Sequence, residues 1–481
     1  MSEYRLLAQR IGLIGLANVL VNLSGIFLLP ILTKSLPVED YGIWAQVNVT
    51  ISLASVVICL GLSASMVRFM AAASSREEIQ ECFYSILAVV MLTGISAMLL
   101  IFCLAEPIAR ALFNGNVAVT RALSVIVFVD AINGLLFSYY RAVQRMKLYA
   151  IFSVAVVYIT IVLAYCFVKL GYGVYGAVLG LAISKVIALA IMGIALLRQV
   201  GFCRPAFRHL GTYFSFGLPI VPTAVFDWIV NSSDRYVIGI LLGTAWVGYY
   251  SPGYLLGSMI AMFVSPIATV LPVALCKYYD HGNINVVETI MSLTIKYLLA
   301  LTIPSVVGLS ILSKPMLMIL STPDIAEQSY LVTPFVAIGM LFMGMASVMS
   351  NVIYIVKKTS ISMKISLMAA LIKLFLLLTL VQLAGVMGAA VATLLIFLFI
   401  FMANKHFALI FLKIRLDYVF ILKSVLASSI MSLLIFFWMP NSLIELLGYI
   451  LISMLIYLLV ILMMNGIDKD EIKFNRSLLN A

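Results

Sequence analysis

A succession of apolar segments, each long enough to cross a lipid bilayer, constrains this chain more than any other feature. A membrane-spanning helix needs about 20 predominantly apolar residues, and segments of that length recur from Arg10 to the C-terminus. Only 10% of the 481 residues are charged, against about 25% in soluble domains. The sequence therefore predicts an all-α integral membrane protein.

The apolar segments number about fourteen, and each is predicted to be one transmembrane helix. The first is too long for the core of a signal peptide and no small-residue cleavage site follows it, so we expect an uncleaved span. The predicted spans cover approximately residues 10–33, 41–69, 83–105, 117–141, 148–168, 173–198, 213–241, 246–276, 288–312, 326–356, 360–382, 385–404, 417–438 and 442–465.

The net charge of +11 could suggest a nucleic-acid partner, but the placement of the charges does not. With the N-terminus inside, most Lys and Arg residues fall in cytoplasmic segments and at their flanks, as the positive-inside rule requires. We therefore expect no nucleic-acid partner, a location in the inner (plasma) membrane, and both termini in the cytoplasm.

The chain carries an internal repeat. Tyr41-Gly42, at the start of the second span, matches Val247-Gly248 at the start of the eighth, and GVYGAVLGLA from Gly173 matches GVMGAAVATL from Gly385. Because the copies are six spans apart, an even number, both enter the membrane in the same direction. The repeat predicts an N-lobe at residues 1–200 (spans 1 to 6), a C-lobe at 210–404 (spans 7 to 12), and an appendix at 413–481 with spans 13 and 14.

Several motifs resemble those of the polysaccharide transport flippases, the Wzx-type exporters of lipid-linked O-antigen units. These exporters belong to the MOP superfamily, with the multidrug and toxin extrusion antiporters and the lipid II flippases. The matching stretches are TKxLxxxxYG at 33–42, LSASMVRF at 62–69, the glycine-rich end at 385–390, and the set Pro219, Pro222, Trp228, Asp234-Arg235-Tyr236, Gly243, Val247-Gly248-Tyr249-Tyr250 and Tyr254. The resemblance covers essentially the whole chain.

The resemblance implies a flippase that moves an oligosaccharide on polyprenyl pyrophosphate from the cytoplasmic to the outer leaflet by alternating access. Such a protein would work beside a polysaccharide polymerase and a chain-length regulator in the same membrane. Two alternatives are a lipid II flippase and a cation-coupled multidrug antiporter. An antiporter for cations should have a path rich in acids, whereas the middle of the spans here holds four basic residues and three acids: Lys185, Arg235, Lys296 and Lys373 against Asp130, Asp227 and Asp234.

Ionisable residues at membrane depth are costly, so they normally face protein or a water-filled cavity. In the seventh span Asp227, Asn231 and Asp234 are four and then three residues apart, which places them on one helical face. Arg235 falls at the edge of that face. Because Asp234 and Arg235 are about 100° apart around the helix, we expect them not to pair with each other. The functional interpretation is a cavity lining in which Arg235 contacts a phosphate or sugar; the alternative is that these residues tie the span to a neighbour or that Arg235 snorkels to the interface.

Other candidates are more isolated in the sequence. Asn22 forms a polar line with Asn18 on the first span, the repeat partner of the seventh. Lys296 lies mid-span with no acid four residues away, so it either meets an anionic substrate or pairs with an acid on another helix; Lys185 and Lys373 are similar but weaker candidates. Arg68 could meet the substrate phosphates at the cytoplasmic entrance, or it could be only a positive-inside anchor. Asp130 and Asp227 are candidates for ion coupling, although Asp130 could simply pair with a lysine.

No catalytic constellation is visible. The three histidines have no carboxylate and nucleophile spaced around them, there is no Walker loop, and every loop is too short to form a domain. This argues against a membrane polymerase or ligase of the same pathway. The six cysteines are scattered, without a CxxC motif or a Cys/His cluster, so they predict neither disulfides nor a metal site. We expect no enzyme, no catalytic residue, no metal and no cofactor.

Overall fold

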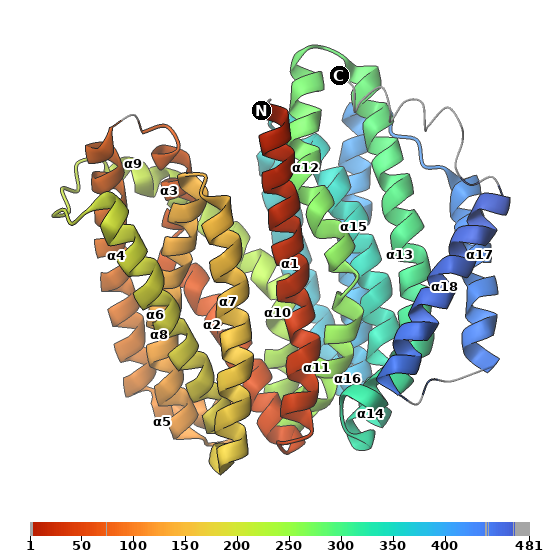
Figure 1. Cartoon of the computed structure of the whole chain (residues 1–481), viewed down its shortest axis with the longest axis horizontal. Helices are drawn as coiled ribbons and strands as arrows, with labels where there is room; N and C mark the ends of the chain where they lie inside the picture. Colours follow the sequence, from red (N-terminus) through yellow and green to blue (C-terminus); the bar gives the residue numbers. More distant parts are fainter. Residues whose placement is uncertain (1–2, 74, 438–439, 441, 465, 467–481) are drawn as a thin grey trace. The chain divides into compact units, whose positions relative to one another are not determined.

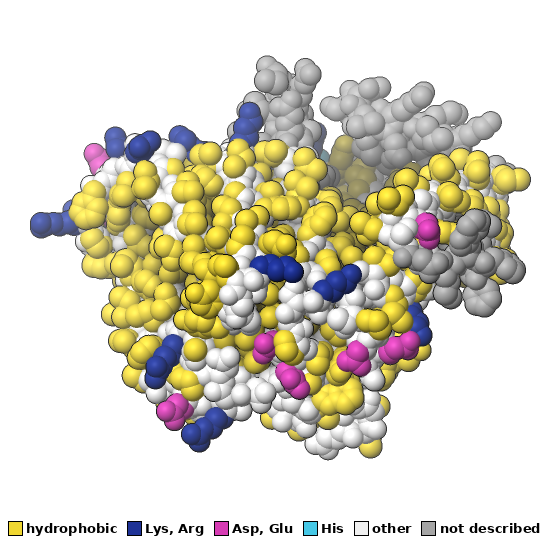
Figure 2. Space-filling model, turned by 60° about the horizontal axis from the view of Figure 1, so that its bottom comes forward, with side chains coloured by type: hydrophobic (Ala, Val, Ile, Leu, Met, Phe, Trp, Pro, Cys, Tyr) yellow, Lys and Arg dark blue, Asp and Glu magenta, His cyan; other side chains and the backbone are white. Residues whose placement is uncertain are grey.

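The computed structural model describes residues 3–73, 75–437, 440, 442–464 and 466, and this part of the chain consists of helices with no strand (Figure 1). The prediction of an all-α membrane protein is confirmed. Large apolar side chains are exposed on many helices, and Figure 2 shows a face covered mostly by hydrophobic side chains. Such a surface suits lipid, which replaces water around the spans of a membrane protein.

Among the described residues, ten helices are long and apolar enough to cross a membrane, or eleven if the bent pair Thr244–Ser258 and Ala261–Ala268 counts as one span. Two of the ten are the 55-residue stretch Met146–Val200 and the 53-residue helix Thr359–Phe411. At 1.5 Å per residue each would extend for about 80 Å, more than twice the bilayer core. Counting each of these two as two spans, the bent pair as one span and the shorter apolar helix Tyr418–Leu433 as one more gives the fourteen that the sequence predicts.

Both long stretches break at glycines that the repeat relates. Gly173 has φ 55° and ψ −143°, and Gly385 has φ 58° and ψ −136°. A residue with a side chain is strained at such a positive φ, whereas glycine is not. The two halves of the chain therefore use the same backbone conformation to separate their fifth and sixth spans.

The chain forms two compact units. Unit 1 comprises Met1–Ser251 and Ser366–Ala392. Its helices are α1 (Glu3–Thr33), α2 (Val38–Cys59), α3 (Leu62–Met70), α4 (Arg76–Cys103), α5 (Ala105–Leu112), α6 (Val117–Ala142), α7 (Met146–Phe167), α8 (Gly173–Val200), α9 (Leu210–Gly217), α10 (Val221–Leu242), the start of α11 (Thr244–Ser258), and part of α16 (Thr359–Phe411). The division into lobes at 1–200 and 210–404 rests on the repeat and stays a prediction.

Helices α4, α6, α7 and α8 of unit 1 lie side by side (Figure 1), and α2 packs against both α6 and α10. The repeat glycines Gly42 and Gly248 allow two reciprocal close approaches. A Cβ on Gly42 would lie 1.9 Å from Thr244 O, and one on Gly248 would lie 2.1 Å from Val38 O. The first turns of α2 and α11 pack closely on each other, so both repeats need a glycine at this position.

Unit 2 comprises Pro252–Ile365 and Thr393–Ala481. Its described helices are the rest of α11, α12 (Ala261–Asp280), α13 (Ile284–Leu320), α14 (Pro323–Ser329), α15 (Val332–Ile355), the second part of α16, α17 (Tyr418–Phe437) and α18 (Leu443–Met463). Helix α13 packs against α12, α15 and α17, and α17 packs against α18. Ser424 and Tyr457 join α17 to α18 by a hydrogen bond of 2.8 Å between their hydroxyl groups.

Candidate functional site

Helix α10 carries the charged residues that the sequence singles out. Pro222 lies in its first turn, where a backbone N–H would have no intrahelical partner to lose. The helix packs on α2, where Trp228 Nε1 donates a hydrogen bond to Ser52 Oγ at 3.0 Å. Gly239 lies against the same helix, since a Cβ there would be 1.8 Å from Gln46 Nε2. This close packing fixes the rotation of α10.

Asp234 is fully buried and pairs with Arg235. The Oδ1 atom of Asp234 accepts hydrogen bonds from Arg235 Nη1 at 3.1 Å and from Arg235 N at 2.9 Å. Its Oδ2 atom accepts one from Tyr250 Oη, on α11, at 2.6 Å. The expectation that these neighbours do not pair is wrong, because the long arginine side chain folds back over the 100° between them. Both oxygens of Asp234 are thereby satisfied inside unit 1.

A different set of α10 residues forms the accessible face. Asp227 is exposed and Asn231 is partly exposed, while the Arg235 side chain is 12% exposed. These three residues are spaced by four, and Asn231 Nδ2 donates to Asp227 O at 2.7 Å while Arg235 Nη1 reaches Asn231 O at 3.4 Å. The predicted polar face is therefore rotated: Arg235 belongs to it, and Asp234 lies on the buried side.

Helix α16 contributes a second basic residue to this region. Lys373 is fully buried and interacts electrostatically with both Asp234 and Arg235. About two turns earlier on α16, Ser366 Oγ donates a hydrogen bond to Asp227 Oδ1 at 2.9 Å. Lys373 therefore adds a second positive charge that acts on the buried carboxylate of Asp234. The sequence made Lys373 a weaker candidate because its span was less expected to face the cavity; spacing along a single span does not show which helix lies opposite.

Asp130 and Lys185 form an ion pair between α6 and α8 with an N–O distance of 2.5 Å. The other carboxylate oxygen of Asp130 accepts a hydrogen bond from Ser55 Oγ, on α2, at 2.7 Å. Asn133 Nδ2 also donates to Lys185 O at 2.9 Å. These contacts join three helices of unit 1 and correspond to the pairing alternative for Asp130. Its role in ion coupling stays a prediction.

Lys296, on α13 of unit 2, is 6% exposed and lies 3.3 Å from Asp417 Oδ2. Its ammonium also lies 4.9 Å from the ring centroid of Phe420. Burial opposes ionisation of Asp417, but a hydrogen bond from Phe420 N and the charge of Lys296 outweigh it, so the pKa of Asp417 lies below its usual range. These contacts favour the alternative in which Lys296 ties its span to a neighbour; substrate binding by Lys296 stays a prediction.

The two remaining candidates lie elsewhere in unit 1. Arg68 is exposed at the end of α3, with its guanidinium 5.0 Å from the ring centroid of Phe216. Asn22 is exposed on α1, and Asn18 is partly exposed. Helix α1 packs mainly against α7.

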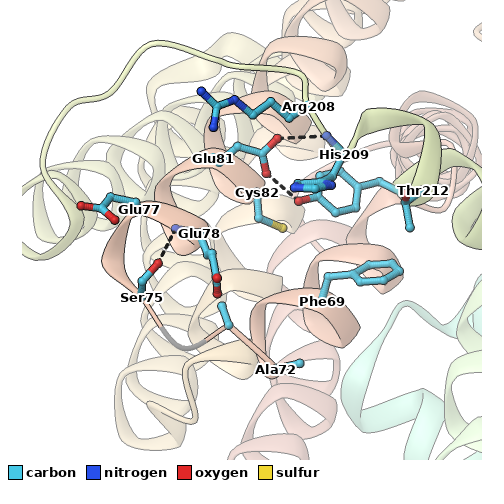
Figure 3. Close-up of a pocket in the computed structure, with 12 residues that line it drawn as sticks. Phe69, Ala72, Ser75, Glu77, Glu78, Glu81, Cys82, Arg208, His209 and Thr212 are labelled. Atoms are coloured by element: carbon cyan, nitrogen blue, oxygen red, sulfur yellow. Dashed lines mark hydrogen bonds between the residues drawn. The ribbon is translucent and has the colours of Figure 1, made fainter.

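A pocket of about 640 Å³ opens between the end of α3, the start of α4 and α9 (Figure 3). Cys82 and Tyr213, which are buried, line it together with more exposed carboxylates and basic groups. The lining residues are Phe69, Ala72, Ala73, Ser75, Glu77, Glu78, Glu81, Cys82, Arg208, His209, Thr212 and Tyr213. Arg68 directly precedes this lining, at the end of unit 1 that the charge distribution predicts to be cytoplasmic.

Comparison with known proteins decides the family. The family model described as polysaccharide biosynthesis protein matches residues 7–275, more than half of the chain. The chain belongs to this family. A second family model, lipid II flippase MurJ, matches residues 243–460. No curated protein matches the sequence.

Solved structures share the fold over nearly all of the chain. The lipid II flippase MurJ in an inward closed conformation has a TM-score of 0.72 at 17% identity and covers 96% of this chain and 99% of that one. An inward-facing multidrug resistance MATE transporter gives 0.68 at 15%, covering 82% and 94%. A MOP superfamily transporter from Pyrococcus furiosus gives 0.54 at 14%, covering 82% and 96%. Family and fold confirm the predicted place in the MOP superfamily of flippases and transporters.

The chemistry available at α10 is anion recognition. A guanidinium presents N–H donors in a planar fork that matches two oxygens of a phosphate or carboxylate. Asp234 holds one side of the Arg235 fork, and Asn231 and Asp227 add an amide and a carboxylate within about 12 Å along the helix. Groups of this kind exchange hydrogen bonds with sugar hydroxyls. The accessible face therefore combines a group that can pair with an anion and groups that can form hydrogen bonds with hydroxyls.

Proposed function

We propose that this polysaccharide biosynthesis protein is a flippase for an oligosaccharide carried on polyprenyl pyrophosphate. It takes the glycolipid from the cytoplasmic leaflet and releases the headgroup at the outer leaflet by alternating access. The family and the fold support a MOP superfamily flippase. The observation that carries the substrate class is Arg235, partly exposed beside Asn231, with Lys373 adding a second positive charge that acts on the same buried carboxylate.

The roles of the α10 residues follow from their surroundings. Arg235 binds a pyrophosphate oxygen pair, which offsets the cost of taking the anion out of water. Asp234 orients Arg235, because both of its oxygens are already engaged. Asn231 and Asp227 bind sugar hydroxyls from the accessible face. Arg68, at the predicted cytoplasmic end, meets the phosphates on entry, and Asn22 adds a polar group from α1.

The remaining proposals concern coupling and context. Asp130 and Asp227 are the acids through which an ion gradient would act, if the cycle uses one. We place the protein in the inner membrane with both termini cytoplasmic, on the charge distribution. Residues 1–200 and 210–404 are proposed as the rocking lobes, and 413–481 as an appendix. A polysaccharide polymerase and a chain-length regulator are the proposed partners, because they would consume and measure the exported units.

Lipid II is the second candidate cargo. The match of residues 243–460 to the lipid II flippase model and the fold shared with that protein favour it. Both cargoes present a sugar on a polyprenyl pyrophosphate, so the Arg235 site serves either one. The O-antigen type of cargo is preferred because the family model that covers more of the chain describes polysaccharide biosynthesis.

The test is translocation in proteoliposomes that contain either a polyprenyl-pyrophosphate oligosaccharide or lipid II. Headgroups that reach the opposite leaflet are counted with an impermeant sugar-modifying reagent. Faster movement of the oligosaccharide carrier supports the proposal, and faster movement of lipid II favours the second candidate. Movement of neither, with export of a cationic dye under a proton gradient, contradicts both and indicates an antiporter.

A further inference from the structure

Each repeat ends in a short linker that is hydrogen-bonded to the third span of the same repeat. In unit 1, residues 201–209 follow α8 and lead into α9 and α10. In unit 2, residues 412–417 follow α16 and lead into α17. The first linker lies against the start of α4, and the second lies against the start of α13. Helices α4 and α13 are the third and ninth predicted spans, so the repeat relates them.

In unit 1 a glutamate and a serine of α4 accept hydrogen bonds from backbone amides of the linker. His209 N donates to Glu81 Oε1 at 3.4 Å, and Phe207 N donates to Ser85 Oγ at 3.1 Å. Tyr213 Oη, on α9, donates to Glu81 Oε2 at 2.6 Å. Figure 3 shows Glu81 reaching toward His209 at the edge of the pocket. Glu81 therefore holds both the end of the linker and the helix that follows it.

In unit 2 a glutamate and a serine of α13 also accept hydrogen bonds from linker amides, although here the glutamate takes the earlier linker residue and the serine the later one. Lys413 N donates to Glu288 Oε1 at 2.6 Å, and Arg415 N donates to Ser292 Oγ at 3.2 Å. One further turn along α13, Lys296 pairs with Asp417 directly before α17. The acceptors are side chains and the donors are backbone amides, so the contact does not depend on which residues form the linker.

The two pairs occupy equivalent places in the sequence. Glu81 and Ser85 are four residues apart, Glu288 and Ser292 are four residues apart, and the offset between them is 207 residues. Tyr41 and Val247, which the sequence repeat relates, are 206 residues apart. Four residues make about one helical turn, so each pair presents two acceptors on one face. Backbone amides that leave a helix need such acceptors, because a buried, unpaired N–H costs free energy.

We propose that Glu81–Ser85 and Glu288–Ser292 are equivalent positioning pairs, one in each repeat, that fix the linker and the helix after it. The first pair sets the position of α9 and α10, and the second sets that of α17. Since α10 carries Arg235, the effect of the first pair on transport rests on the proposed function. The fixing of the linkers does not.

Hydrogen exchange measured by mass spectrometry on the full chain in nanodiscs tests the pairs. Glu81→Ala should speed exchange of the amides between residues 207 and 213 about tenfold, the equivalent of one hydrogen bond. Glu81→Gln should keep the wild-type rate, because its oxygen still accepts and its amide nitrogen can bond Tyr213. Glu77→Ala, an exposed glutamate one turn earlier on α4, is the matched control. Glu288→Ala should speed exchange only around 413–417.

Unchanged exchange in Glu81→Ala and Glu288→Ala, or faster exchange spread over the whole chain, would overturn the positioning role. Exchange needs no substrate, so this result stands even if the protein carries no glycolipid. In the translocation assay, Glu81→Ala should slow transport about tenfold and Glu81→Gln should restore it. A wild-type transport rate in Glu81→Ala, alongside faster linker exchange, would refute the link between the first pair and α10.

Discussion

Arg235 in unit 1 and Lys296 in unit 2 are both basic residues within apolar spans, but their surroundings differ. Arg235 pairs with the buried carboxylate of Asp234, on which Lys373 also acts electrostatically, and its side chain reaches an accessible polar face. Lys296 contacts Asp417 and the ring of Phe420, next to the linker that is hydrogen-bonded to α13. We propose that the Arg235 region receives an anion, whereas the contacts of Lys296 join α13 to the segment directly before α17.

The difference shows that a charge at membrane depth is not by itself a site. Both residues satisfy the rule that such charges face protein or a cavity. What separates them is burial: Arg235 pairs with a fully buried carboxylate and reaches an accessible polar face, whereas Asp417, the partner of Lys296, is 42% exposed. The following predictions test that separation, from the largest expected effect to the smallest.

The largest effect on stability is expected from Asp234→Ala. Removing this fully buried carboxylate leaves Arg235 and Lys373 close together without it, which should cost about 3–5 kcal/mol. Thermal unfolding in detergent, followed by tryptophan fluorescence, measures the loss. Asp227→Ala, an exposed acid on the same helix, is the control and should have little effect. Equal losses in the two variants would contradict the buried role of Asp234.

A smaller loss is expected from Lys185→Met, about 2 kcal/mol, because the charged Asp130 loses a hydrogen-bond partner between α6 and α8. The double variant Asp130→Asn with Lys185→Met should recover part of this stability, since no unmatched charge remains. A double variant that is less stable than the single one, in the same unfolding assay, would show that the pair is more than a structural tie.

Lys296→Met should reduce stability by only about 1 kcal/mol, because Asp417 is 42% exposed and water can solvate it. The methionine side chain keeps the apolar contact with Phe420. Translocation should stay within about twofold of wild type. A large loss of transport in a normally stable Lys296→Met protein would place Lys296 in the substrate path and remove the contrast with Arg235.

The pH dependence of the Lys296–Asp417 pair is the smallest effect. The pKa of Asp417 is lowered in the folded protein, so the pair adds stability above the ordinary aspartate pKa of about 3.9 and loses it as the pH falls through the lowered value. The difference in unfolding temperature between wild type and Lys296→Met should therefore be constant from about pH 7 to 5 and shrink only in stronger acid. A difference that shrinks near pH 6 would contradict this.

Much of the fold was predictable because the helical spans are long and apolar. The repeat was also visible, and its glycines correspond to real constraints: Gly173 and Gly385 share a positive φ, and Gly42 and Gly248 allow close helix approaches. The linker pairs were missed, although Glu81–Ser85 and Glu288–Ser292 have the repeat offset. A glutamate and a serine at the end of a span look like ordinary interfacial residues until their partners are known.

The candidate site was predictable in part. Periodicity located the charged face of α10 but rotated it, because spacing along one helix does not show that the side with Asp234 is buried against other helices. It could not identify Lys373, Tyr250 or Asp417 as partners, since each lies on a different helix or linker. Contacts between helices depend on how the helices pack, and the spacing of residues along one helix does not show this.

The most direct test of the central claim compares Arg235→Ala with Lys296→Met in the glycolipid translocation assay, at equal amounts of folded protein. If Arg235 binds the pyrophosphate, Arg235→Ala should lose transport by about 100-fold, the cost of a charge-assisted phosphate contact, and Arg235→Lys should recover only part of it. Lys296→Met should transport nearly as well as wild type. Normal transport by a stable Arg235→Ala protein would contradict the account.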